Sequence, residues 1–190
     1  MKAFNGFKAE RRASREILPA GGYVAKIIGA RIDSFDTYSK LVIAFDVTEG
    51  KYAGFFQKDF DSNTREDKKW RGVLRLTVPV DDGSEKDEWS KKNFGNAMWA
   101  LEESNHGYHW DWDETKLKGK TVGVLFRNRE WEMNGNTGWT TECCDFDSVQ
   151  RIRDNEFKTP KDKPLPTKPV GGNYGGFTPI ASGDSDDLPF

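Results

Sequence analysis

The strongest secondary-structure signal in this chain is the sequence Lys40-Leu41-Val42-Ile43-Ala44-Phe45-Asp46-Val47-Thr48. Apolar side chains occur at every second position along it, which is the pattern of a β-strand with one buried face. We therefore predict a strand here and expect its apolar face in the core. The residues that share this face are Leu41, Ile43, Phe45 and Val47.

Further strands are expected on both sides of this one. Residues 23–32 are apolar and β-branched through most of their length, which predicts a preceding strand. Residues 55–60 predict a third strand, and a charged insertion at 61–72 follows it. Residues 73–80 form a short apolar run that contains Pro79, so we expect an edge strand or a strand end there.

One helix is predicted over residues 84–105. Ser84 precedes Asp87 by three positions, which resembles a capping box at a helix start. Asn105-His106-Gly107 provides a signal for the end of the helix. The apolar side chains that fall on one face at helical spacing are Phe94, Ala97, Met98 and Leu101.

Residues 121–131 and 139–146 predict a final β-hairpin. Their connection contains Asn134-Gly135, a dipeptide that strongly favours a hairpin turn. In the apolar alternation of this hairpin, Phe126 falls on the core side. Residues 148–155 add a short helical turn.

The order of these elements is strand, strand, strand, insertion, helix, strand, strand. It matches the oligonucleotide-binding (OB) fold, a five-stranded Greek-key barrel with a helix between strands 3 and 4. We therefore predict a mainly β chain with an OB domain over residues 18–157 and an insertion after strand 3. A polar, basic arm over residues 1–17 precedes the domain.

The body of the chain resembles a family of phage-borne domains that are linked to recombination and replication functions. The resemblance spans roughly residues 18–150. It is carried by Leu18-Pro19-Ala20-Gly21-Gly22-Tyr23, by residues 40–50 and by Tyr52-Ala53-Gly54. It implies an OB-type single-stranded DNA-binding protein of a phage or prophage, located in the cytoplasm of an infected or lysogenic bacterium.

The composition changes from residue 158 onward, where six of the eight prolines and five glycines gather. Such a composition favours a disordered, flexible linker over residues 158–182. The last eight residues, 183–190, form an acidic tip that ends in Leu188-Pro189-Phe190. Phe190 is suited to an apolar pocket on a partner, while its free carboxylate is suited to a basic side chain.

This tip resembles the acidic C-terminal tip of bacterial single-stranded DNA-binding proteins, which ends Asp-Asp-(Ile/Leu)-Pro-Phe. The resemblance implies recruitment of replication and repair enzymes. The alternative interpretation is an ordinary solvated tail. The residues that would contact a partner are Asp184, Asp186, Asp187, Leu188, Pro189 and Phe190.

The composition is that of a polar protein, with 32% charged residues and a net charge of −2. This charge argues against a strongly basic, DNA-coating protein, so DNA binding would need basic residues sorted onto one face. The 7 Trp exceed what a core of this size needs, so some are expected to face a ligand. No apolar run approaches the ~18–20 residues of a membrane-spanning helix, and Cys143-Cys144 are interpreted as free thiols in a reducing compartment.

Single-stranded DNA requires aromatic faces that stack on bases, at ~1–3 kcal/mol per base, and basic side chains that neutralise phosphates. Basic and aromatic residues interleave in three places, although each aromatic could instead belong to the core. The candidates in the first loop are Phe35, Tyr38 and Lys40; those in the third strand and the insertion are Phe56, Lys58, Phe60, Arg65, Lys68, Lys69, Trp70 and Arg71; those in the last hairpin are Arg127, Arg129, Trp131 and Trp139.

Other clusters give weaker signals. Residues 108–113 contain three aromatics but also two aspartates that would repel phosphate, so we expect them to pack against the barrel. The two histidines and Cys143-Cys144 do not predict a zinc site, because adjacent residues of a strand point to opposite faces. With no phosphate-binding glycine loop and no catalytic Ser/His/Asp order, we expect no enzymatic activity, no cofactor and no metal.

Two functions remain. The first is a single-stranded DNA-binding protein of phage replication or recombination, which coats and protects DNA and recruits partners through its tip. The second is an adaptor or recombinase-loading protein whose OB domain mainly binds protein, with DNA contact secondary. Neither involves a membrane, and the oligomeric state stays open, a homo-oligomer included.

Overall fold

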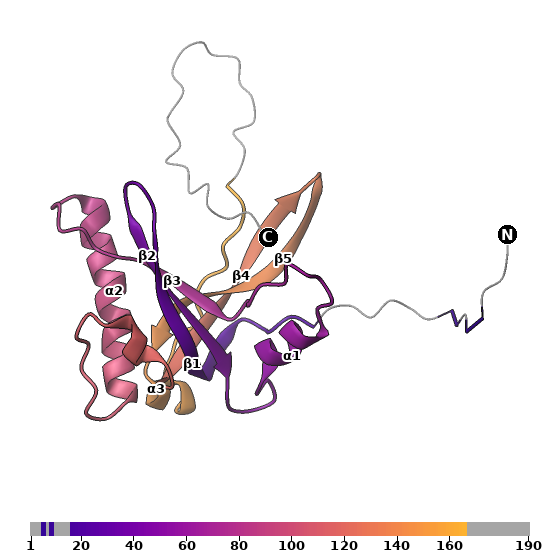
Figure 1. Cartoon of the computed structure of the whole chain (residues 1–190), viewed down its shortest axis with the longest axis horizontal. Helices are drawn as coiled ribbons and strands as arrows, with labels where there is room; N and C mark the ends of the chain where they lie inside the picture. Colours follow the sequence, from indigo (N-terminus) through magenta and orange to yellow (C-terminus); the bar gives the residue numbers. More distant parts are fainter. Residues whose placement is uncertain (1–4, 7, 10–15, 167–190) are drawn as a thin grey trace, which may run out of the picture.

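Within the described residues, five strands form one antiparallel sheet in the order β3-β2-β1-β4-β5 (Figure 1). The computed structural model describes residues 5, 6, 8, 9 and 16–166. The strands are β1 (Gly21–Ser34), β2 (Ser39–Val47), β3 (Val73–Thr77), β4 (Thr121–Met133) and β5 (Asn136–Asp147). The helices are α1 (Phe55–Ser62), α2 (Glu85–Ser104), the short 3-10 helix η1 (Glu114–Leu117) and α3 (Val149–Arg153).

Strand β1 joins the two halves of the sheet. Its first residues, 21–26, pair with residues 121–126 of β4, and its later residues pair with β2. The register with β2 shifts between Ile27 and Gly29, which marks a β-bulge. Because a bulge bends its strand and increases the local twist, β1 can carry the sheet from its β2–β3 half to its β4–β5 half.

The core is built on the face of β2 that the sequence predicted. All four residues of the alternating apolar set are buried, from Leu41 to Val47. Phe45 lies among three aromatic rings, with centroid distances of 5.9 Å to Phe56, 6.2 Å to Phe126 and 6.0 Å to Phe146. The core positions predicted for Phe45 and Phe126 are therefore confirmed.

Helix α2 covers the sheet with the face that the sequence predicted. Its cap is also confirmed, because the Ser84 hydroxyl accepts a hydrogen bond from the Asp87 backbone N–H at 3.1 Å. The helix ends at Asn105, two residues before Gly107, which takes a positive φ of 76°. No helix in the described ranges is long and apolar enough to cross a membrane. The buried apolar residues of α2 are Phe94, Ala97, Met98, Ala100 and Leu101.

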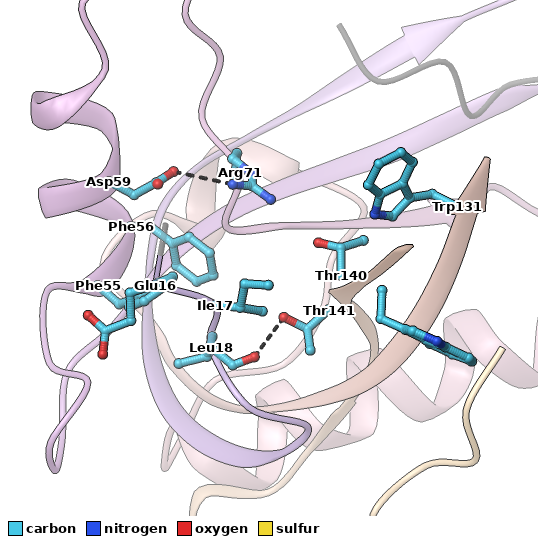
Figure 2. A pocket seen from close by; sticks show the side chains of 11 residues that line it. Glu16, Ile17, Leu18, Phe55, Phe56, Asp59, Arg71, Trp131, Thr140 and Thr141 are labelled. Carbon is cyan, nitrogen blue, oxygen red and sulfur yellow. Dashed lines mark hydrogen bonds and ion pairs between the residues drawn. The ribbon is translucent and has the colours of Figure 1, made fainter. Parts of the chain in front are cut away.

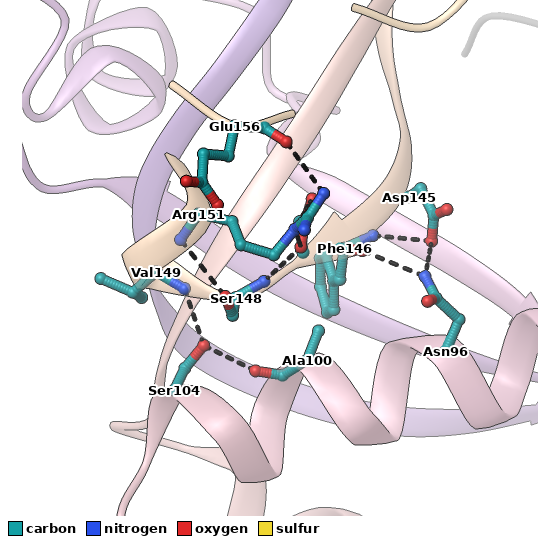
Figure 3. A network of polar contacts seen from close by, with 10 residues as sticks. Asn96, Ala100, Ser104, Asp145, Phe146, Ser148, Val149, Arg151 and Glu156 are labelled. Carbon is teal, nitrogen blue, oxygen red and sulfur yellow. Dashed lines mark hydrogen bonds and ion pairs between the residues drawn. The ribbon is translucent and has the colours of Figure 1, made fainter. Parts of the chain in front are cut away.

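A polar network fixes the end of β5 to α2 and α3 (Figure 3). The Asn96 side-chain amide donates to the Asp145 carboxylate at 3.1 Å and to the Phe146 carbonyl at 3.2 Å. The Ser104 hydroxyl donates to the carbonyl one turn earlier in α2 and accepts from the Val149 N–H at 3.0 Å. These bonds satisfy backbone groups where β5 ends and α3 begins, so the last hairpin is firmly seated at this end. Burial in this junction raises the pKa of the Asp145 carboxyl.

Residues 55–60 form a helix, so the strand predicted there is wrong. Gly54, with a positive φ of 70°, precedes the first turn of α1 but offers no side-chain cap. The cap comes instead from Asp46 on β2, whose carboxylate accepts from the backbone N–H groups of Phe56 at 2.9 Å and Gln57 at 3.2 Å. The third strand is β3, so the charged insertion precedes that strand rather than following it.

The sheet is open, and its two edges are β3 and β5. These edge strands contact each other without pairing as neighbours in the sheet. Helix α2 lies between the third and fourth strands along the chain. The mainly β class is confirmed, whereas the closed barrel that the sequence predicted is not seen.

The last hairpin turns at Asn134 and Gly135, both with positive φ, as the Asn-Gly signal predicted. Beyond α3, the first part of the predicted linker lies along β4 rather than apart from the domain. The Lys163 N–H donates to the Asn128 carbonyl at 2.8 Å, and the Lys163 carbonyl accepts from the Glu130 N–H at 2.9 Å. The rest of the predicted linker and the acidic tip, 167–190, lie outside the described residues, as does most of the basic arm.

Candidate nucleic-acid interface

A pocket of about 300 Å³ lies between α1, the loop before β3 and the last hairpin (Figure 2). It brings together predicted DNA-binding residues from two separate segments, Arg71 from the insertion and Trp131 and Trp139 from the hairpin. The residues that line it are Glu16, Ile17, Leu18, Phe55, Phe56, Asp59, Arg71, Trp131, Trp139, Thr140 and Thr141.

Trp131 is positioned by the strand opposite it. Gly138 is its partner in the β4–β5 register, and a Cβ built on Gly138 would lie 2.8 Å from the indole Cζ2. The ring therefore rests over bare backbone at that position. Trp139, the next residue of β5, is 48% exposed, so the pocket has one indole that is fixed in place and one that is open to solvent.

Among the described residues, the charged groups that line the pocket are Arg71 and the carboxylates of Asp59 and Glu16. The Arg71 guanidinium lies between Asp59 and Trp131 in Figure 2, with Nη1 3.8 Å from the Asp59 Oδ2. Glu16 adds a second carboxylate at the pocket wall. Negative charge therefore exceeds positive charge here, which disfavours a phosphate inside the pocket and favours an uncharged or cationic group.

Three members of the insertion group, Trp70, Phe60 and Lys68, have a structural role. The indole N–H of Trp70 donates to the Phe45 carbonyl at 3.0 Å, which fixes the loop to β2. Phe60 contacts Trp70 at a centroid distance of 5.7 Å, and the Lys68 ammonium lies 4.4 Å from the Phe60 ring centroid. These contacts hold the loop that presents Arg71. The remaining basic residues of this group, Lys58, Arg65 and Lys69, are exposed.

Phe56 is not available to stack on DNA. It is only 6% exposed and packs on Phe126 with nearly parallel rings, at a centroid distance of 6.0 Å. Its predicted place on an exposed strand face followed from the wrong assignment of residues 55–60. In helix α1 the side chain of Phe56 points into the core instead.

The first-loop group forms a compact cluster where β1 turns into β2. The rings of Phe35 and Tyr38 stack at 4.7 Å with an angle of 24°, and the Lys40 ammonium lies 5.3 Å from the Tyr38 ring centroid. In Figure 1 this turn and the last hairpin both rise at the top of the view, on either side of β3. The cluster thus combines a stacked aromatic surface with a positive charge.

Two further basic residues, Arg31 and Arg75, were missed by the sequence reasoning. Both lie directly opposite Val42 in the sheet register, so the three side chains form a row on the outer face of β1, β2 and β3. Val42 is only 3% exposed although it is outside the main core cluster. The signal was the alternation Leu74-Arg75-Leu76, which marks β3 as a strand with one exposed face.

An acidic residue accompanies this row. Asp33 lies on the same strand as Arg31, and its Oδ1 accepts a hydrogen bond from Arg31 Nε at 2.7 Å. The hydrogen bond from Arg31, together with the charges of Arg31 and Arg75, holds the pKa of the Asp33 carboxyl below its usual value. Next to this row, Lys40 pairs with Thr77 and Asp33, so the Lys40 cluster and the two arginines share one surface.

The arginines of the last hairpin are partly neutralised. Arg127 binds the Glu142 carboxylate through Nε at 2.8 Å and Nη2 at 2.6 Å. Arg129 lies 3.3 Å from the other oxygen of the same carboxylate. Two guanidinium groups thus share the Glu142 carboxylate, and two further carboxylates, Glu130 and Glu132, flank Trp131 on the same strand.

The aromatic run before β4, which the sequence predicted to pack against the barrel, lies against the core and against Phe94 of α2. Tyr108 is buried and Trp110 is half-buried against the core. Trp112 is 71% exposed, but one face of its indole stacks on Phe94 at 5.8 Å with an angle of 11°. Trp112 has a positive φ of 65°, which is uncommon for a bulky residue.

The two cysteines lie at an irregularity of β5. Leu125 pairs with Asp145 and Phe126 pairs with Cys143, so Cys144 is the extra residue of a bulge. Both thiols are free, and burial raises the pKa of Cys143 well above its usual value and that of Cys144 to about 11. Among the described residues, no group of three or more His, Cys, Asp or Glu side chains is placed to hold a metal ion.

Compared with models of known protein families the chain matches none, and none of the curated proteins matches it.

Proposed function

We propose that this chain is a non-catalytic, single-stranded DNA-binding protein. The observation that carries the proposal is the pocket, where Arg71, Trp131 and Trp139 come together from segments about sixty residues apart. The indole faces of the pocket suit stacking on bases, while basic side chains outside it, Arg31, Arg75 and Lys40 on the outer face of the sheet, suit the phosphates.

The outer face of β3 offers a path from this pocket to the first-loop cluster. Arg71 lies two residues before β3, Arg75 lies on its exposed face, and Lys40 pairs with Thr77 at its far end. A strand of this length covers about 13–17 Å. A bound strand that follows β3 would meet basic side chains at the start, the middle and the end of this path.

The fold supports the same proposal. We infer an OB-type barrel that is partly open, since this architecture has five strands in Greek-key order and is often incompletely closed. The sheet order, the place of α2 between the third and fourth strands and the contact between β3 and β5 all agree with it. In OB folds, the face of strands 2 and 3 with the neighbouring loops binds oligonucleotides.

We further propose that the acidic tip recruits other proteins to the bound DNA. Its support is the sequence of residues 183–190, in which three aspartates precede the apolar Leu188-Pro189-Phe190. Residues 158–166 leave the domain along β4, next to the hairpin that carries Trp131. The setting we propose is replication or recombination of a phage in the bacterial cytoplasm.

A second function keeps some support from the charge of the pocket. Glu16 and Asp59 disfavour phosphate, so the same aromatic walls would suit a neutral or basic side chain of a partner protein. This is the adaptor or recombinase-loading alternative, in which DNA contact is secondary.

The deciding experiment compares a fluorescent oligo(dT) with a duplex of equal length by anisotropy, over a series of salt concentrations. For DNA binding we expect a clear preference for the single strand and an affinity that falls as salt rises, with a slope of about −0.7 per phosphate contact. Equal affinity for the duplex, or no salt dependence, would favour the adaptor function instead.

A further inference from the structure

The pocket beside α1 has two chemically different sides. Its apolar side is formed by aromatic and aliphatic groups, among them Phe55, Trp131 and Ile17. Its polar side is formed by Asp59 and Arg71, whose side chains are 12% and 44% exposed. A flat, uncharged ring with polar groups along one edge would fit both sides.

The charges that line the pocket determine which part of a bound DNA strand can enter it. Two carboxylates against one guanidinium make the pocket unsuitable for a phosphate, but they do not repel a neutral base. The phosphates can remain on the outer face of the sheet, where Arg31 of β1 and Arg75 of β3 lie on either side of Val42. A single base would then leave the strand and enter the pocket sideways, with its ring between the apolar walls.

We infer that this pocket takes one base of the bound strand and that the pair Asp59 and Arg71 selects guanine; the inference rests on the proposed DNA binding. An unpaired base exposes its Watson–Crick edge for hydrogen bonding. Guanine presents neighbouring N1–H and N2–H donors that suit a carboxylate, and its O6 and N7 acceptors suit a guanidinium.

The other bases match this pair less well. Thymine has one N–H between two carbonyl groups, and adenine and cytosine each offer only an amino group as donor. Arg71 Nη1 lies 3.8 Å from Asp59 Oδ2, so both groups stand on the same side of the pocket, where the edge of one base can face them together. A carboxylate has about four acceptor positions, so Asp59 can accept from a base in addition to its present contacts.

The test measures four oligonucleotides that differ at one position. Each is a twelve-residue thymidine strand, unmodified or carrying a single guanine, adenine or cytosine in the middle, and each competes with labelled oligo(dT) for the full-length protein. We expect the guanine oligonucleotide to bind at least about fivefold more tightly than the other three, since a good bidentate contact discriminates at this level or above. Equal affinity of all four overturns the inference while leaving DNA binding intact.

Two variants locate the preference on the structure. Asp59→Asn should lose the guanine preference but keep the affinity for pure oligo(dT) and its salt dependence. Asp61→Asn is the matched control, because Asp61 lies on the same helix outside the pocket lining and binds Gln57. If Asp59→Asn still prefers the guanine oligonucleotide, Asp59 does not select guanine. If Asp61→Asn loses the preference too, the pocket is not its source.

The failure of the proposed function has a different signature. No binding of any single strand would remove both proposals together. A short arginine-containing peptide is titrated in parallel while tryptophan fluorescence is recorded, and we expect no change. If the peptide quenches tryptophan fluorescence and the guanine oligonucleotide does not, the pocket binds a protein side chain and not a base. That result would overturn the inference.

Discussion

The indole of Trp131 lies over the backbone of Gly138, so close that a Cβ on Gly138 would be 2.8 Å from Cζ2 and 3.0 Å from Cε2. Glycine is thus required at this position by the neighbouring ring, since its own φ is not positive. A ring backed by the sheet on one side has lost most of its freedom to turn. Such a ring can stack on a base at a small cost in side-chain entropy.

Gly138→Ala is therefore expected to weaken oligo(dT) binding by displacing Trp131. The expected loss approaches that of one stacked base, ~1–3 kcal/mol. The fold should survive, because the clash involves the far end of a side chain near the tip of a hairpin. Anisotropy with oligo(dT) measures the affinity, and urea unfolding measures the stability.

Gly95→Ala serves as the control for this variant. A Cβ on Gly95 would meet nothing within 4 Å, and the residue lies inside α2. Alanine there should leave DNA binding unchanged and stabilise the helix by about 1 kcal/mol. If Gly138→Ala binds oligo(dT) like the unmodified protein, the Trp131 ring does not contact DNA.

Replacing Arg31 and Arg75 together by glutamine should reduce the salt dependence of DNA binding. Each lost phosphate contact should make the slope of log affinity against log salt about 0.7 less steep. The measurement is an anisotropy titration at four salt concentrations. The matched control replaces Lys86 and Lys92 of α2 by glutamine, which changes the net charge equally on a different element. Equal slopes for the two double variants would show that the outer face of β1, β2 and β3 does not bind the DNA phosphates.

Phe56→Ala is expected to destabilise the protein by about 3–5 kcal/mol, because the side chain is buried among Phe45, Phe55 and Phe126. The free energy of unfolding in urea measures this loss. Phe35→Ala, at a site that is 48% exposed, should cost much less. A small loss for Phe56→Ala would contradict its place in the core and restore the exposed position that the sequence predicted.

The wrong prediction for Phe56 shows which parts of the fold the sequence alone can predict. Local signals were sufficient where the signal and the structure involve the same residues: the alternation from Leu41 to Val47, the Ser84 cap and the Asn134-Gly135 turn. The apolar residues of 55–60 are Phe55, Phe56 and Phe60, which do not alternate, and the helix they form is capped by Asp46 from another element. A cap supplied across the fold leaves no start signal within the segment itself, so nothing in the local sequence marks the start of this helix.

The candidate site was predictable in its residue types but not in its grouping. Arg71, Trp131 and Trp139 were named from aromatic and basic interleaving, yet only the folded chain places them around one pocket. Trp70, like Trp131, lies near basic residues in the sequence. In the structure its indole N–H instead donates to the Phe45 carbonyl and helps to hold the loop before β3. Arg75 was missed because residues 73–80 were given a minor role as a strand end.

The thiol of Cys144 predicts a loss of stability in mildly alkaline solution. Burial raises its pKa to about 11, whereas a thiol in the unfolded chain ionises near 8.5. The folded state therefore holds this proton more tightly, so its contribution is fully present below about pH 8.5 and is lost as the pH rises towards 11. Urea midpoints between pH 7.5 and 9.5 should fall, and they should fall less in Cys144→Ser. Identical pH profiles for both proteins would contradict the raised pKa.

Removal of Leu188-Pro189-Phe190 should abolish recruitment of partner proteins and leave binding of single-stranded DNA intact. A buried aromatic anchor supplies most of the energy of a small interface, and the linker sets only its reach. Asp184, Asp186 and Asp187 remain in the shortened chain, so any competition of the acidic tip for the basic face persists and the DNA affinity should change little. Pull-down of replication proteins from a bacterial lysate measures the first effect, and oligo(dT) anisotropy the second.

The control replaces the same three residues by Gly-Ser-Gly, which keeps the chain length and the charges of Asp184, Asp186 and Asp187. If the anchor is the apolar side chains, the replacement should lose the partners as completely as the deletion does. If the acidic residues alone attract the partners, both variants should still capture them at low salt and release them as salt rises, since exposed charges are screened within ~8–10 Å at ordinary ionic strength. If either variant still retains the same partners at physiological salt, the tip is an ordinary solvated tail. The partners would then bind the folded domain.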